Sequence, residues 1–134
     1  MKAPVILATA LIILVCSCKK SEPINSNLFG KWEMRKRYGG NIYPPDTSYT
    51  PGNGNIIQFN TDSTYVSYAD FKEISSGAFH ISKNADTVNH ATYSTIYFAA
   101  DSAFRSIIII NNGTLTLKPL IPDLSTFDYQ KIGN

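Results

Sequence analysis

The chain has few of the residues that disulfide scaffolds, metal centres and nucleic-acid surfaces require. Its 134 residues include only two Cys and two His, 16% of them are charged, and the formal net charge is +2. Two cysteines cannot build a disulfide framework, and so small a net charge argues against a nucleic-acid-binding surface. An uncharged apolar run covers Ala3 to Val15, about thirteen residues where a transmembrane helix needs roughly 20. A permanent transmembrane helix is therefore not expected.

Signatures of catalysis and metal binding are also missing. The chain has no Gly-X-Ser-X-Gly, no His-Glu-X-X-His and no phosphate-binding loop. His80 is expected to point outward from a strand and His90 to lie in a loop, with no cysteines or regularly spaced acids to support them as ligands. We therefore predict that the protein is not an enzyme and that it uses neither a metal nor a cofactor.

The N-terminus has the pattern of a secretory signal: Lys2, then the apolar run, then small residues. The sequence Val15-Cys16-Ser17-Cys18 resembles the lipobox of bacterial lipoproteins, with Val15 at −3, Ser17 at −1 and Cys18 at +1. This resemblance implies cleavage between Ser17 and Cys18 and attachment of lipid to the Cys18 thiol. Lys19, not Asp, follows Cys18, which in that family implies the outer membrane of a Gram-negative envelope, with either leaflet possible.

The chain accordingly divides into three parts. Residues 1–17 are predicted to be a lipoprotein signal peptide, residues 18–27 a lipidated tether, and residues 28–134 a folded domain. Hydrophobic residues make up 43% of the chain and aromatic residues 12%, so wholesale disorder is excluded.

From Leu28 onward, short segments alternate between apolar and polar residues and are separated by turn residues, which is typical of β-strands. Asn112-Gly113 is the strongest hairpin signal, whereas residues 39–55 and Lys83 to His90 read as loops. The expected strands are Phe29–Tyr38, Ile56–Asn60, Thr64–Asp70, a strand through Gly77–Ile81, Tyr93–Phe98, Ala103–Ile110, Thr114–Lys118 and Ser125–Ile132. We predict an all-β, eight-stranded, antiparallel up-and-down barrel, whose interior is either filled or holds one small ligand.

Gly30-Lys31-Trp32, at the head of the first strand, resembles the Gly-X-Trp signature of lipocalins. The segments 49–54, 57–60 and 129–132 resemble small bacterial lipocalin-like lipoproteins, and the resemblance spans roughly Leu28 to Ile132. It implies that Gly30 and Trp32 have structural roles, with Trp32 closing one end of the barrel and Lys131 stacking on it. It also implies that residues 39–55 cross the open end as a lid, with Tyr43 and Tyr49 as aromatic contacts.

Alternation places one cation on the apolar face of the first strand, because Lys36 shares a face with Trp32 and Met34, whereas Arg35 and Arg37 share the opposite, charged face. Lys36 either meets a ligand carboxylate at the barrel mouth or extends to solvent. The candidate ligand-binding residues are Met34, Lys36, Tyr43, Tyr49, Ile57, Phe59, Phe79, Leu115, Phe127 and Tyr129.

These residues favour a membrane-anchored barrel that binds a small apolar or amphipathic ligand. The alternative is a filled barrel that acts as a protein-interaction or inhibitor module of the cell envelope. An exposed patch of Tyr68, Tyr93 and Tyr97 would favour the alternative.

Overall fold

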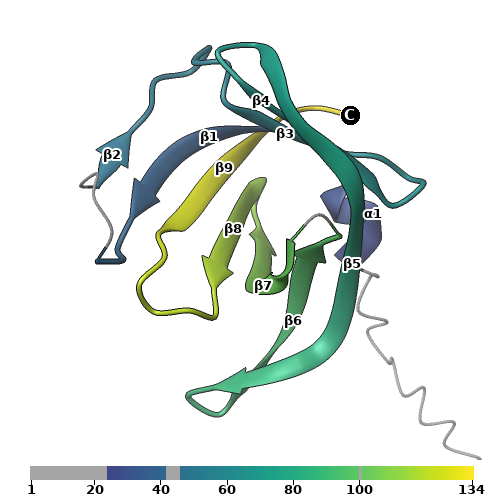
Figure 1. The fold of residues 1–134 in the computed structure, drawn as a ribbon, viewed down its shortest axis with the longest axis vertical. Coiled ribbons are helices and arrows are strands. Elements are labelled where there is room, and N and C mark those ends of the chain that lie inside the picture. The colour runs from purple at the N-terminus through teal and green to yellow at the C-terminus, as the bar shows by residue number, and fades with distance from the viewer. Residues whose placement is uncertain (1–23, 42–45, 100) are drawn as a thin grey trace, which may run out of the picture.

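The computed structural model describes residues 24–41, 46–99 and 101–134 (Figure 1). Ser17, Cys18 and Tyr43, to which the sequence assigns cleavage, lipid attachment and ligand contact, lie outside the described residues. The described elements are α1 (Ile24–Leu28), β1 (Gly30–Tyr38), β2 (Thr47–Ser48), β3 (Ile56–Phe59), β4 (Thr64–Ala69), β5 (Lys72–Val88), β6 (Ala91–Phe98), β7 (Asp101–Asn111), β8 (Thr114–Pro119) and β9 (Thr126–Gly133).

All the strands belong to one antiparallel sheet that closes on itself. Successive strands from β3 to β9 are neighbours, β1 pairs with β3 on one side, and β9 pairs with β1 on the other. In Figure 1, β1 and β9 lie side by side where the ring closes. The short β2 pairs with the end of β1 beyond the point where β3 stops. The ring therefore has eight strands, and the predicted barrel is confirmed.

The turns follow the local chemistry of the sequence. Asn112 and Gly113 both have positive φ angles, of 47° and 76°, which is the conformation of the two central residues of a tight hairpin turn. The Asp62 carboxylate accepts hydrogen bonds from the backbone N–H and the hydroxyl of Thr64. Such residues stabilise the turns that join neighbouring strands.

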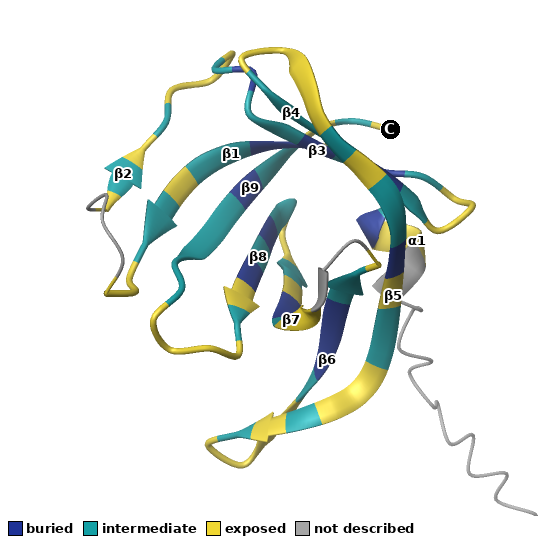
Figure 2. Ribbon diagram, viewed as in Figure 1, coloured by how far each residue is buried: buried dark blue, intermediate teal, exposed yellow. Residues whose placement is uncertain are grey.

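Inward-facing side chains pack into one core. Trp32 and Leu115 are fully buried, and Phe59 contacts Phe79 edge-to-face with ring centroids 5.1 Å apart. Figure 2 shows buried positions alternating with half-buried or exposed ones along several strands. The core cluster is Leu28, Trp32, Ile57, Phe59, Tyr65, Phe79, Ile96, Ile108, Leu115, Leu117 and Tyr129. β1 and β9, which close the ring, both contribute to this cluster, through Trp32 and Tyr129.

One end of the barrel, called here the helix end, is closed by α1 and the start of β1. The indole N–H of Trp32 donates to the carbonyl oxygen of Leu28 at 2.6 Å, and the Lys131 ammonium lies 5.5 Å from the centre of the Trp32 ring. Gly30 has φ +116°, and a Cβ there would collide with the carbonyl oxygen of Gly133. Gly30, Trp32 and Lys131 therefore lie together at the helix end.

Two expectations from the sequence are wrong in detail. Lys83 to Val88 is not a loop, because β5 continues to Val88 and pairs with β6 after an irregularity between Ser82 and Asp86. The expected tether ends in the helix α1, whose last residue, Leu28, is fully buried. In the described ranges, no helix has the length and apolar character needed to cross a bilayer.

Candidate functional site

A β-bulge in β1 decides which cation faces the barrel interior. Met34 pairs with Tyr129 of β9, but the next recorded pair is Lys36 with Asp128, so Arg35 is an extra residue. An extra residue reverses the alternation of side chains beyond it. Arg37 pairs with Phe127, which shares a face with the buried Leu117 of β8. Arg37 therefore faces inward.

The predicted inward orientation of Lys36 is wrong for the same reason. Lys36 pairs with Asp128, whose carboxylate accepts a hydrogen bond from Thr116 on the outer face. The Lys36 side chain is exposed, and its ammonium lies 4.9 Å from the centre of the Tyr38 ring. A strict period of two cannot reveal the bulge, although a charge on the apolar face marks the segment as irregular.

The Arg37 guanidinium is incompletely paired. One terminal N–H donates to the Thr47 hydroxyl at 3.4 Å, a long hydrogen bond. The Nε atom is buried and has no hydrogen-bond partner. Among the described residues, no carboxylate lies within ion-pairing distance of Arg37, whereas Arg35 pairs with Glu33. Arg37 is thus a cation at the inner wall with an unused donor.

Two tyrosines, Tyr49 and Tyr129, lie close to each other on the inner face that also carries Arg37. Arg37 pairs with Thr47 of β2, and the Tyr49 backbone N–H donates to the Arg35 carbonyl oxygen at 2.8 Å. Alternation from Thr47 turns Tyr49 inward. Burial is the main cause that raises the pKa of Tyr129, and the nearby Tyr49 phenol raises it further. Tyr129 is therefore neutral near pH 7 and can donate a hydrogen bond.

The inner wall becomes more exposed toward β2, at the end called here the β2 end. Along β1, Trp32 is fully buried, whereas Met34 and Arg37 are half-buried. Along β9, Tyr129 is 8% exposed and Phe127 is half-buried. These inward-facing side chains are therefore more exposed at the β2 end than at the helix end.

The predicted ligand-binding residues therefore separate into two groups. Ile57, Phe59, Phe79 and Leu115 are buried core residues toward the helix end. Met34, Tyr49 and Phe127 are half-buried and lie toward the β2 end, with Tyr129 between the two groups. Strict alternation along the first strand predicts Arg37 on the charged outer face, so Arg37 was not among the predicted ligand-binding residues.

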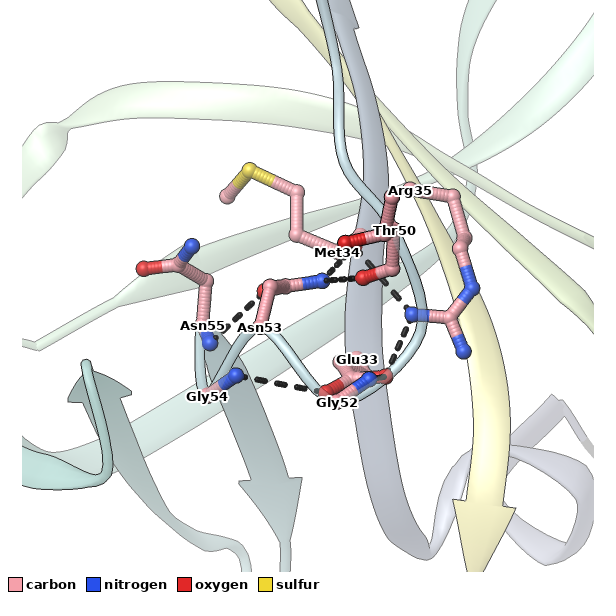
Figure 3. Close-up of polar contacts among 8 residues, drawn as sticks. All are labelled: Glu33, Met34, Arg35, Thr50, Gly52, Asn53, Gly54 and Asn55. Atoms are coloured by element: carbon pink, nitrogen blue, oxygen red, sulfur yellow. Dashed lines mark hydrogen bonds and ion pairs between the residues drawn. The ribbon is translucent and has the colours of Figure 1, made fainter.

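The described part of the segment 39–55 does not form the predicted lid. It runs back along β1, where the buried Glu33 carboxylate accepts hydrogen bonds from the backbone N–H groups of Gly52 (3.0 Å) and Gly54 (3.3 Å) and from Arg35 (Figure 3). The Asn53 side chain donates to the carbonyl oxygens of Met34 and Thr50. Tyr49–Asn55, called here the strap, is thus fixed to β1.

The outer surface offers weaker candidates. A hollow of about 530 Å³ lies beside the β8–β9 connection, lined in part by Tyr38, Ile109, Lys118 and Ile121. Tyr68, Tyr93 and Tyr97 are each half-buried rather than exposed. His80 stacks on Tyr97 with ring centroids 4.9 Å apart, and in the described part of the chain no group of acids, histidines or cysteines is placed to hold a metal ion.

Comparisons of this chain with protein-family models, with curated proteins and with solved structures find no match.

Proposed function

We propose that this protein binds a small amphipathic molecule inside the β2 end of its barrel. The observation that carries the proposal is the half-buried inner wall formed by Met34, Arg37, Tyr49 and Phe127. Small-molecule sites are concave and mostly apolar, with a few polar groups that fix orientation. Burial of the ligand's apolar surface supplies about 25 cal/mol per Å², and Arg37 and the tyrosines supply the polar contacts.

Binding is tested with the neutral fluorescent probe N-phenyl-1-naphthylamine and a chain of residues 24–134. We expect saturable fluorescence enhancement in the wild type and a loss of at least fivefold in affinity in Met34→Trp, which places a larger side chain at the proposed wall. Ser48→Trp adds the same side chain at an exposed position of β2 and is the matched control. A wild-type domain that gives no saturable signal, and yields no small molecule in native mass spectrometry, would overturn the proposal.

We also propose that the protein is a lipoprotein of the Gram-negative envelope, anchored through Cys18. The support is the lipobox-like Val15-Cys16-Ser17-Cys18 after the apolar run. A single acyl chain holds a protein only marginally at a membrane, whereas several chains hold it stably. In cell fractionation, Cys18→Ala should move the full chain out of the outer-membrane fraction, with Cys16→Ala as the control. Retention of an unlipidated Cys18→Ala chain in that fraction would contradict the anchor.

A further inference from the structure

We propose that the ligand of this barrel carries a carboxylate, and that Arg37 and Tyr129 receive it. The inference rests on the proposed function, since it names the chemical class that the interior would select. It starts from the buried Nε of Arg37, which has no partner, and from the absence of a carboxylate near Arg37 among the described residues.

The position of Arg37 makes an anionic partner favourable. A buried donor without an acceptor costs free energy, and the cost is larger for a charged group in apolar surroundings. Arg37 pairs with Phe127 across the β1–β9 ladder, and Phe127 pairs in turn with Leu117. The protein supplies the neutral Thr47 hydroxyl at 3.4 Å and no negative charge from the described residues. A ligand oxyanion would satisfy the unused donor and neutralise the charge.

A planar carboxylate fits this arrangement better than a phosphate. The guanidinium presents two parallel N–H donors that match the two oxygens of one carboxylate. Arg35, the other arginine on β1, is already paired with Glu33 of the same strand, beneath the strap. One cation balances the single charge of a carboxylate, whereas a phosphate monoester carries up to two negative charges near pH 7.

The neighbouring side chains complete the recognition of an acid with an aliphatic tail. The Tyr129 hydroxyl makes no hydrogen bond to another residue within the described ranges, and burial keeps it protonated. It can therefore donate to a carboxylate. Met34, on the same face as Tyr129, and Phe127 line the half-buried wall along which the tail would lie.

The test measures displacement of N-phenyl-1-naphthylamine from residues 24–134 by decanoate, decanol and decyl phosphate, each below its aggregation concentration. The quantity compared is the preference, defined as the decanol dissociation constant divided by that of decanoate. We expect Arg37→Met to reduce this preference at least tenfold, equivalent to about 1.4 kcal/mol, with little change for decanol. Lys36→Met removes the same charge from the adjacent, outward-facing position and should leave the preference within twofold.

Two further variants keep the test decisive. Arg37→Lys retains the charge but loses the paired donors, so it should reduce the preference by an intermediate factor, and it serves if Arg37→Met does not fold. Tyr129→Phe should reduce the preference without weakening decanol.

Each contrary result has a distinct meaning. An unchanged preference in Arg37→Met, or an equal fall in Lys36→Met, overturns the carboxylate inference and leaves the proposed function intact. Tighter binding of decyl phosphate than of decanoate also overturns the carboxylate assignment. Failure of the probe and of all three aliphatic ligands to bind the wild type overturns both proposals.

Discussion

Glu33 shows how one residue can face outward and still be buried. Its side chain lies on the outer side of β1, yet the residue is only 3% exposed because the strap folds over it. Burial raises the pKa of the Glu33 carboxyl, but the hydrogen bonds from Arg35, Gly52 and Gly54 outweigh burial and hold the pKa below its ordinary value of 4.5. The ionised form is therefore the one that the folded protein stabilises.

This linkage predicts an acid-sensitive contribution to stability. A carboxyl whose pKa is lowered by folding stabilises the folded state above its ordinary pKa, and this contribution disappears as the pH falls through the lowered value. Glu33→Gln should lower the free energy of unfolding by about 1.5–3 kcal/mol at pH 7, the range for hydrogen bonds to charged groups. The difference from wild type should shrink below pH 4.5.

Urea denaturation at pH 7, 4.5 and 3 measures this effect. Glu73→Gln, at an exposed carboxylate on β5, is the control and should change stability by less than about 0.5 kcal/mol. A Glu33→Gln deficit that stays constant across these pH values would contradict the role assigned to the ionised carboxylate.

At the scale of elements, the strands could be predicted from the sequence and their irregularities could not. Asn112-Gly113 and the alternation around Leu115 and Leu117 identify a hairpin with local information alone. The bulge at Arg35 depends on how β1 pairs with β9, about ninety residues later in the chain, as the Tyr38–Asp128 hydrogen bond shows. No pattern within β1 encodes that register, so Arg37 was placed on the wrong face.

The long β5–β6 hairpin is a second such irregularity. The base of this hairpin is part of the ring. The pairing of β6 with β7 begins at Ser94, which lies opposite Ile108. Among the described strands, Ala91, Thr92 and Tyr93 therefore pair only with β5. Segments with few neighbours open locally at a lower free energy than the core.

We predict that the amides of residues 83–93 exchange with deuterium at least tenfold faster than those of residues 77–82 and 95–97. Hydrogen exchange measured by NMR on residues 24–134 would resolve the two groups. Equal protection along the whole of β5 would show that the hairpin is as stable as the ring.

At the scale of the whole molecule, the ring is completed by contacts between distant parts of the chain. α1 adds to this closure through its last residue, because Leu28 is buried and its carbonyl oxygen accepts the Trp32 indole N–H, whereas residues 24–27 were predicted to be part of a tether. The helix that supplies the acceptor for Trp32 is only five residues long and has no clear pattern of its own, so the sequence did not predict it.

Leu28→Ala should therefore destabilise the whole barrel by about 2–5 kcal/mol, as is typical when a buried leucine is truncated. Guanidinium denaturation followed by Trp32 fluorescence measures the loss. Asn27→Ala, at the exposed neighbouring position in α1, should cost less than about 0.5 kcal/mol. Similar losses in the two variants would mean that α1 stabilises the barrel by some route other than the burial of Leu28.

The pairing of β1 with β9 has a consequence for biogenesis. β1 precedes the other strands of the ring, and β9 supplies its last ladder with the residues Thr126–Gly133. During synthesis, the edges of β1 and β8 stay unpaired until the residues of β9 have left the ribosome. Unpaired strand edges can pair with other chains and form aggregates. Contacts of such long sequence separation also form slowly, so the ladder between β1 and β9 is expected to form late in folding.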